Sequence, residues 1–457
     1  MKVLVAIANY GNTHTDYLNR LIREYQSMPY EIDIVVLSDT VKVFGAEIEV
    51  IVGLPARDPW SLPFSHRKLF IERADVYDLF IYSEDDTLIT RRNIDSFLQV
   101  TEVLQSDEIA GFTAYEIDGS GNYSYPAFHG PFRWIPGSVR KYKGYTFARF
   151  SNDHSACYLL TRTQLRAVLN SGGYSTIPHA GRYDMLVSAA TDPYTQCGLT
   201  KVICISHIND FVVHHLPNKY FGRVGISQED FGIQIEALLS ANEGSLHLLR
   251  SDKEEGAGKF YFEPIRDDIL KLIPPNTRNV LSIGCGHAMT EKKLVEMGMD
   301  VVGIPLDSII AGCATARGVK TTVADFDQAF ESLSGSMFNC IIVPEILEYV
   351  RNPEEILKQC SKLIAGDGMI IISMTNINFI TNVIDKLRSR NSIQWYSLLK
   401  VWRTSTRREM SQLFARIGLK EINIIHVFRE RLSALESTKV TMLKDALARR
   451  IVLAARM

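Results

Sequence analysis

The sequence has few cysteines and no excess of charge of either sign. Its seven cysteines, among 457 residues, form no CxxC pair, which argues against a zinc site and favours a reducing compartment. Lys and Arg total 50 and Asp and Glu total 52, so the net charge is −2. Proteins that bind duplex nucleic acid usually carry a basic excess, and we therefore expect no nucleic-acid partner.

Long apolar runs and export signals are also missing. No run approaches the roughly 18 apolar residues of a membrane span. The apolar residues 1–8 precede a polar segment without a cleavage region, so we expect no signal peptide. We expect a cytoplasmic protein and leave open a peripheral contact with the inner membrane.

The length predicts more than one domain, because single domains usually have about 100–200 residues. A charged and glycine-containing stretch near residues 241–260 interrupts an otherwise apolar-periodic chain. We therefore predict one domain over 1–240, a linker over 241–260 and a second domain over 261–457. The oligomeric state stays open.

Both halves alternate short β-branched runs with helical patterns, which predicts an α/β fold with a mainly parallel sheet in each. In the first half we expect strands at 3–8, 32–37, 48–52 and 79–82, and helices at 16–26 and 67–78. In the second half we expect a helix at 265–272 and strands at 280–283, 301–304, 321–323, 340–343, 369–374 and 422–427. Residues 109–145 are rich in Gly, Tyr, Pro and Phe and predict a loop-rich surface, either substrate-facing or structural.

Three consecutive acids, Glu84, Asp85 and Asp86, directly follow the apolar strand predicted at 79–82. Adjacent carboxylates at the end of a sheet strand repel one another unless a cation is present. Hard divalent cations such as Mg²⁺ take oxygen ligands and bridge carboxylates to phosphates. The alternative is an ordinary acidic turn.

Together with ANYG after the first strand and VVLSD at the end of the second, the triplet resembles the GT-A type of glycosyltransferase, over roughly residues 1–235. In that family a DxD motif after a sheet strand binds a divalent metal and the diphosphate of a nucleotide sugar; Glu84 departs from the commoner first Asp. The resemblance implies a GT-A-like mixed sheet, Mn²⁺ or Mg²⁺, a nucleotide-sugar donor and a glycan or glycolipid acceptor. It assigns the nucleotide sugar to Ala8, Asn9, Asp39, Arg67, Lys68 and Asp85, and the metal to Glu84, Asp86, His214 and His215.

The same resemblance extends to the segment 181–206, which is similar to the xED region of that family. It maps Asp184 onto the catalytic base that deprotonates the acceptor hydroxyl; a helix cap is the alternative, and Asp153 is an earlier candidate. Only one of His214 and His215 is needed at the metal, and both could instead be surface residues. For Arg67 and Lys68 the alternative is a solvated helix face.

In the second half, VLSIGCGHA joins a predicted strand to a predicted helix, as a glycine-rich ligand loop does. VVGIPLD, VADFD, FNCIIVPEILEYVRNPEEIL and LIAGDGMIIISMTN follow in order. These five segments resemble class I S-adenosylmethionine-dependent methyltransferases over roughly residues 258–456. The resemblance implies a Rossmann-like, seven-stranded sheet and binding of S-adenosylmethionine by Ser282, Gly284, Cys285, Gly286, Asp307 and Asp325.

Several residues depart from that family's pattern. Ser282 stands where an Asp commonly helps to hold the cofactor, and Pro305 stands where an acid grips the ribose, with Asp307 as a substitute. Further departures are Ala288 for Gly, Tyr349 for His and Asn339 for Asp. Glu345 and Glu348 lie near the acceptor by resemblance, or are helix N-terminal charges. A degenerate, structural domain is therefore the alternative.

We predict a bifunctional transferase that adds a sugar and methylates with S-adenosylmethionine. One alternative is a glycosyltransferase with a degenerate methyltransferase-like domain, and another is a methyltransferase with a non-catalytic glycan- or nucleotide-sugar-binding domain. A nucleotidyltransferase in the first half is a third. The basic, aromatic stretch 386–408 faces an anionic glycan or a lipid surface, or is a solvated helical cap.

Overall fold

The computed structural model describes residues 1–125, 133–222, 225–241, 259, 261–350, 352–376, 407–428 and 448–457. The chain divides into two compact units, Met1–Phe128 with Ser138–Phe231, and His129–Gly137 with Gly232–Met457. Most of the linker expected at 241–260 and of the basic stretch 386–408 lies outside the described residues, so both stay predictions. In the part of the chain that is described, no helix is long and apolar enough to cross a membrane.

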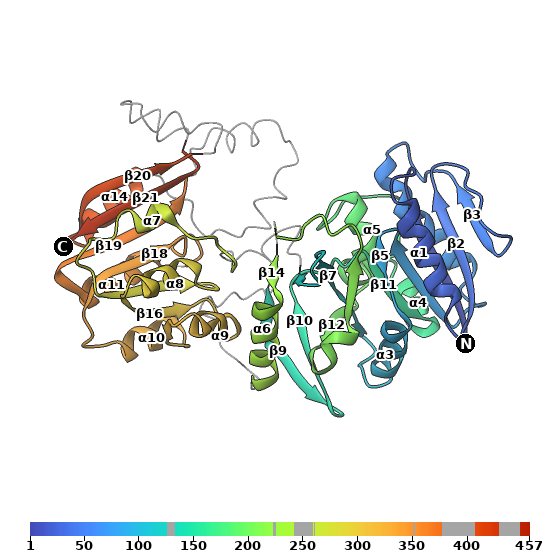
Figure 1. Ribbon diagram of the computed structural model, residues 1–457, viewed down its shortest axis with the longest axis horizontal. Helices are drawn as coiled ribbons and strands as arrows, with labels where there is room; N and C mark the ends of the chain where they lie inside the picture. The colour runs from blue at the N-terminus through green and yellow to red at the C-terminus, as the bar shows by residue number, and fades with distance from the viewer. Residues whose placement is uncertain are drawn as a thin grey trace. The chain divides into compact units, whose positions relative to one another are not determined.

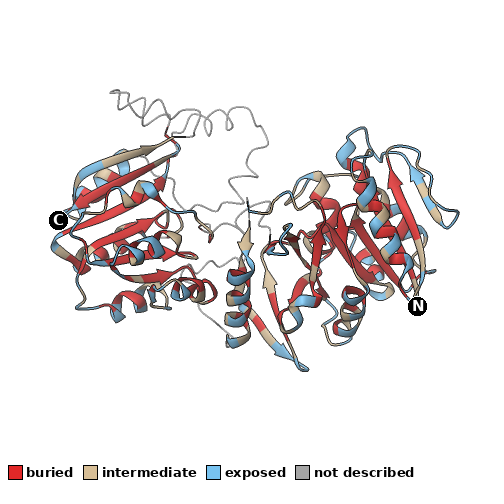
Figure 2. Cartoon of the chain, in the orientation of Figure 1, coloured by how far each residue is buried: buried red, intermediate tan, exposed pale blue. Residues whose placement is uncertain are grey.

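The first unit is built on a five-stranded sheet with the order β11-β4-β1-β2-β3. Its strands are β1 (Lys2–Asn9), β2 (Glu31–Ser38), β3 (Ile48–Val52), β4 (Leu79–Glu84) and β11 (Cys157–Thr161). β1 to β4 run parallel and β11 runs antiparallel to β4. The apolar runs of β1, β2 and β4 are buried (Figure 2), as expected for strands covered on both faces. The four strands expected at 3–8, 32–37, 48–52 and 79–82 are all present.

Helices of this unit pack beside these strands (Figure 1). The helices up to the end of the unit are α1 (Thr15–Gln26), η1 (Pro59–Phe64), α2 (Ser65–Glu72), α3 (Arg91–Thr101), α4 (Arg162–Asn170), α5 (Met185–Thr195) and η2 (Ile205–Asp210). The next helix, α6 (Gln228–Ser240), belongs mostly to the second unit. The helix expected at 67–78 ends at Glu72, because residues 73–76 form turns before β4 begins.

The segment expected to be loop-rich is mostly strand where it is described. Two small sheets have the orders β6-β12-β10-β9 and β14-β8-β7-β13-β5. Their strands are β5 (Thr87–Leu88), β6 (Glu108–Ala110), β7 (Thr113–Ile117), β8 (Tyr123–Tyr125), β9 (Trp134–Tyr142), β10 (Tyr145–Phe150), β12 (Thr200–Cys204), β13 (Val212–His215) and β14 (Ile226–Ser227). The loop-rich expectation was wrong because the dense Gly and Pro concealed aromatic strand formers, and in β7 buried positions alternate with half-buried ones.

The second unit contains a seven-stranded sheet with the order β17-β16-β15-β18-β19-β21-β20. Its strands are β15 (Asn279–Cys285), β16 (Asp300–Pro305), β17 (Lys320–Thr321), β18 (Phe338–Pro344), β19 (Ile364–Thr375), β20 (Lys420–Val427) and β21 (Arg450–Arg456). β21 runs antiparallel to both of its neighbours, and β15 to β19 pair in parallel. The predicted Rossmann-like α/β sheet is confirmed.

Both faces of this sheet carry an apolar core. Residues of β15 belong to two separate clusters, with Leu281 and Ile283 in one and Val280 in the other, and Cys285, after a register shift, joins Val280. The described helices of this unit, beyond the end of α6, are α7 (Asp267–Leu270), α8 (Met289–Glu296), α9 (Ser308–Ala316), α10 (Phe326–Ser332), α11 (Pro353–Leu363) and α14 (Arg407–Arg416). Because the faces are filled, ligand-binding groups are left to the strand ends and the loops that follow them.

Candidate functional site

Parallel pairing brings the ends of β1, β2 and β4 to one edge of the first sheet. Ala8 is paired with Glu84 across β1 and β4. The buried Asn9 donates from Nδ2 to Asp85 Oδ2 at 2.5 Å. Asp39, which follows β2, accepts from the backbone N–H of Gly11 at 2.8 Å. The sequence-predicted residues of this edge are therefore close together, with Asp39 holding the loop after β1.

His14 belongs to the same cluster and was missed from the sequence. Its Nδ1 lies 2.8 Å from Asp85 Oδ1 and 3.8 Å from Asp86 Oδ2. Each of these three residues offers one ligand atom, and the three atoms lie within 4.8 Å of one another. Two carboxylates and an imidazole are a donor set that fits a divalent metal. The available signal was the position of His14 in the loop directly after β1.

His215, rather than His214, lies at this cluster. Antiparallel pairing of β13 with β5 sets His215 opposite Thr87, and its Nε2 lies 3.4 Å from Asp86 Oδ2. Its Nδ1 lies 2.6 Å from Glu116 Oε1, which fixes the ring. His214 instead contacts Asn218 Oδ1 through Nε2 at 3.1 Å.

The pKa values of the three acids of the triplet are shifted in different directions. Burial, with repulsion from Asp86 and Asp85, raises the pKa of Glu84 well above its usual value. Burial also raises the pKa of Asp85. For Asp86 burial opposes ionisation, but His215, His14 and Lys219 outweigh it, so the pKa of Asp86 lies below its usual value. Asp86 is therefore the carboxyl of the three that ionises most readily and the strongest metal-binding candidate.

Asp184 forms the N-terminal cap of α5. Its Oδ1 accepts from the backbone N–H of Val187 at 3.0 Å. Its charge also contributes to the raised pKa of Glu84, so it lies within electrostatic reach of the triplet. Asp153, the other candidate base, pairs with Arg182 Nη1 at 2.8 Å. The structure thus gives Asp184 a capping role and leaves its catalytic role as a proposal.

The Arg67 side chain is held by other groups of the protein. It is fully buried, its Nη2 lies 2.9 Å from Asp192 Oδ2, and it donates to the carbonyls of Ser175, Ser188 and Ala189. We therefore correct the expected diphosphate contact, because every one of these partners belongs to α5 or the chain before it. Lys68 points to solvent and forms an exposed pair with Glu72 at 3.7 Å, which matches the solvated-face alternative.

In the second unit, the glycine-rich loop after β15 is packed against the segment that precedes α7. Gly284 has a φ of +76°, and a Cβ on Gly286 would lie 2.1 Å from the carbonyl oxygen of Tyr261. That oxygen accepts from the backbone N–H of His287 at 2.8 Å. Lys259 Nζ donates to the carbonyl of Gly284 at 2.8 Å. Both glycines are thus required by close approach of neighbouring chain.

Ser282 and Cys285 are both buried in β15. Ser282 Oγ donates to Glu291 Oε1 of α8 at 2.6 Å. Burial raises the pKa of the Cys285 thiol, so this residue is a packed side chain and no thiolate nucleophile. Glu291 was missed from the sequence because a helix-start acid has no distinctive pattern.

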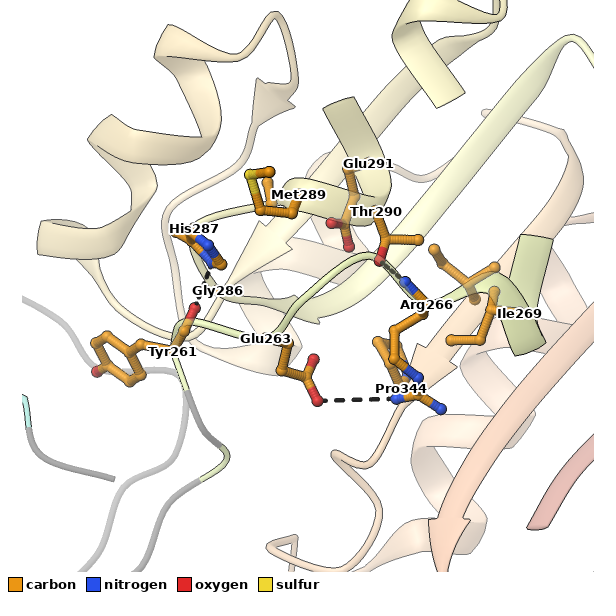
Figure 3. Close-up of a pocket in the computed structure, with 12 residues that line it drawn as sticks. Tyr261, Glu263, Arg266, Ile269, Gly286, His287, Met289, Thr290, Glu291 and Pro344 are labelled. Carbon is orange, nitrogen blue, oxygen red and sulfur yellow. Dashed lines mark hydrogen bonds and ion pairs between the residues drawn. The ribbon is translucent and has the colours of Figure 1, made fainter. Parts of the chain in front are cut away.

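A small pocket lies beside this loop (Figure 3). Its polar lining includes Glu263, Arg266, His287, Thr290 and Glu291. Arg266 is 4% exposed.

Oxygen atoms surround the Arg266 guanidinium. Its Nη2 lies 2.7 Å from Asp268 Oδ2 and 2.6 Å from Ser373 Oγ, and its Nη1 lies 3.4 Å from Glu345 Oε1. Arg266 could not be predicted from the sequence, since an isolated Arg near a helix start is common.

Asp307 and Asp325 both cap helices. Asp307 Oδ1 accepts from the N–H groups of Ile309 and Ile310 at the start of α9, and Asp325 accepts from Gln328 N–H at the start of α10. The second carboxylate oxygen of Asp307 accepts from the hydroxyl of Tyr261. Burial raises the pKa of Asp307. The Tyr261 hydroxyl would therefore compete with a ribose hydroxyl for this oxygen of Asp307.

Glu345 and Glu348 follow the end of β18. Glu345 has a φ of +54°, which is uncommon outside glycine, and its Oε1 also pairs with Arg450. Glu348 accepts from the backbone N–H of Thr375. Burial raises the pKa of Glu348 to about 7. Glu348 therefore ties the loop after β18 to the end of β19, while Glu345 directly follows the pocket-lining Pro344.

Comparison with known sequences finds similarity to methyltransferases in this part of the chain. The profile of a family described as "methyltransferase domain" matches residues 257–424. A ubiquinone biosynthesis O-methyltransferase from Actinobacillus pleuropneumoniae is 30% identical over 109 residues, or 22% of this chain and 46% of the relative. The same enzyme from Xylella fastidiosa is 30% identical over 119 residues, or 25% and 48%. This chain spans about half the length of these curated relatives.

Among solved structures, a SAM-dependent methyltransferase from Archaeoglobus fulgidus is 14% identical, with 40% of this chain and 87% of that chain covered and a TM-score of 0.32. Residues 257–424, which include the glycine-rich loop and the pocket, are similar to methyltransferase domains.

Proposed function

We propose that the second unit binds S-adenosylmethionine and transfers its methyl group. The observation that supports this most directly is the pocket beside the glycine-rich loop, in the region 257–424 that matches methyltransferase domains. Its nearly buried Arg266 offers a charge-assisted hydrogen bond to a carboxylate. The residues present therefore fit the amino-acid end of S-adenosylmethionine. They fit its ribose less well, because Pro305 has no carboxylate and Asp307 already accepts from Tyr261.

The chain's contribution to this reaction is binding and alignment. S-adenosylmethionine, when bound, supplies a methyl group that is already activated as a sulfonium. Arg266, held by Asp268 and Ser373, fixes one end of the pocket. Glu345, held by Arg266 and Arg450 directly after the pocket-lining Pro344, is placed to orient the hydroxyl or amine of an acceptor.

The test is calorimetric titration of the whole chain with S-adenosylhomocysteine, which binds without turnover. We expect saturable binding that Arg266→Gln weakens by about ten- to a hundredfold, because a charge-assisted bond is lost. Arg278→Gln, an exposed position in the same unit, is the matched control and should bind like the unmodified chain. Absence of binding by the unmodified chain would refute the proposal and favour a structural domain.

A second function, metal-dependent glycosyl transfer, is supported by the cluster of His14, Asp85, Asp86 and His215 in the first unit. A bound divalent metal would neutralise the diphosphate of a nucleotide sugar. Mixed imidazole and carboxylate donors suit Mn²⁺ better than Mg²⁺, which prefers oxygen alone. Asn9 and Asp85 would lie beside the nucleotide, and Asp184 would accept the proton of the acceptor hydroxyl.

Titration with UDP in the presence of Mn²⁺ tests this second function. Asp86→Ala should abolish binding and nucleotide-sugar turnover, whereas Asp75→Ala, an exposed carboxylate of the same unit, should change neither. Binding without turnover would favour a non-catalytic nucleotide-sugar-binding domain. Release of pyrophosphate from a nucleoside triphosphate and a sugar phosphate would favour a nucleotidyltransferase.

Both activities together would make the chain a bifunctional transferase acting on a glycan or glycolipid. The pairing of a sugar-transfer unit with a methylation unit is what supports a shared acceptor. We propose a cytoplasmic location with the acceptor supplied in solution or at the inner membrane. The compatible alternative is a methyltransferase whose first unit only binds the glycan or the nucleotide sugar.

A further inference from the structure

The carboxylate of Glu291 is buried at the pocket with little protein compensation. Glu291 is 4% exposed and lines the pocket. Its side chain accepts from the neutral hydroxyl of Ser282, which donates to Oε1 at 2.6 Å. Among the described residues, no Lys, Arg or His forms an ion pair with it. A buried carboxylate with one neutral donor is costly, so a cationic ligand group in the pocket would stabilise it strongly.

The position of Glu291 fits this role. Residue 291 lies in the first turn of α8, where the helix dipole favours a negative charge. Ser282 lies in the middle of β15, and its hydroxyl donates a hydrogen bond to the Glu291 carboxylate. The negative charge of this part of the pocket therefore comes from the helix, and the strand supplies the hydroxyl that orients it.

Arg266 lies in the same pocket, where Asp268, Glu345 and Glu263 already balance its charge (Figure 3). Its backbone N–H donates to Thr290 Oγ1 at 3.0 Å, which ties the Arg266 segment to the turn that carries Glu291. Both side chains are nearly excluded from water. Because protein carboxylates already balance the charge of Arg266, the group that would stabilise this pocket is a cation at Glu291, such as the ammonium of an α-amino acid.

We propose that Glu291 binds the ammonium of the amino-acid end of S-adenosylmethionine, so that helix α8 provides the anion that β15 lacks at Ser282. This inference rests on the proposed methyltransferase function. It implies that Ser282 is a positioning residue for Glu291 and that the serine at this place is no sign of a degenerate site.

The test compares S-adenosylhomocysteine with 5′-methylthioadenosine, which has the same nucleoside and thioether and lacks the amino-acid group. We expect Glu291→Gln to weaken binding of S-adenosylhomocysteine by about ten- to a hundredfold. Binding of 5′-methylthioadenosine should change by less than about threefold. Glu296→Gln, on the exposed end of the same helix, is the matched control and should leave both affinities unchanged.

The double variant Ser282→Asp with Glu291→Ser returns the carboxylate to the strand and guards against a folding artefact. We expect it to recover most of the lost S-adenosylhomocysteine affinity. If Glu291→Gln changes both ligands equally or changes neither, while the unmodified chain binds both, this inference is overturned and the proposed function stands. If the unmodified chain binds neither ligand, the proposed function itself fails, and this inference with it.

Discussion

Arg67 shows how one residue can satisfy a functional pattern and yet be structural. Its guanidinium is fully buried and pairs with Asp192. Its Cζ also lies over the ring of Phe64, 4.2 Å from the ring centroid. Arg67→Met should lower the free energy of unfolding by about 3–5 kcal/mol, because Asp192 would lose its buried ion-pair partner. Thermal and chemical unfolding measure this. Lys68→Met on the exposed face should leave stability unchanged, and equal effects of the two substitutions would contradict the assignment.

Glu348 predicts a pH dependence of stability. Its pKa is raised by burial to about 7 in the folded chain, against an ordinary value of 4.5. The folded state therefore binds more protons between these values, and stability falls as pH rises from about 4.5 to 7. Glu348→Gln, which keeps an oxygen for Thr375 N–H, should raise the free energy of unfolding by roughly 3 kcal/mol at pH 8 and by little at pH 4.5. An equal gain at both pH values would contradict this origin.

At the scale of elements, the cap of α5 separates the two roles of Asp184. Asp184→Ala removes the acceptor for Val187 N–H and should cost about 0.5–2 kcal/mol of stability. Asp184→Asn keeps that cap, because asparagine is an equally good N-cap residue. If Asp184 is also the base, Asp184→Asn should retain the melting temperature and lose nucleotide-sugar turnover. Full turnover in Asp184→Asn would leave Asp184 as a cap alone.

Elements of the two large sheets could be predicted because their signals are local. Buried parallel strands such as β1 and β15 are short β-branched runs. The order of motifs along residues 280–374 predicted the second sheet. The acid triplet could be predicted for the same reason, because the three acids directly follow their strand in the sequence. His14, Arg266 and Glu291 could not be found, because their roles arise from contacts with residues such as Asp85, Ser373 and Ser282 that only the folded chain brings near. The choice of His215 over His214 likewise required the β13–β5 register.

For the whole molecule, each unit has its own buried sheet and its own candidate ligand, so the two ligands should act separately on thermal unfolding. A ligand that binds only the folded state stabilises it by about 2.7 kcal/mol at a concentration 100 times its dissociation constant. In scanning calorimetry of the full chain, S-adenosylhomocysteine should raise the unfolding temperature of one transition, and UDP with Mn²⁺ should raise that of another. Asp86→Ala should remove only the second effect, and Arg266→Gln should reduce only the first. If either ligand stabilised both transitions equally, the two sites would be energetically coupled, and sugar transfer and methylation could then no longer be assigned to independently folding units.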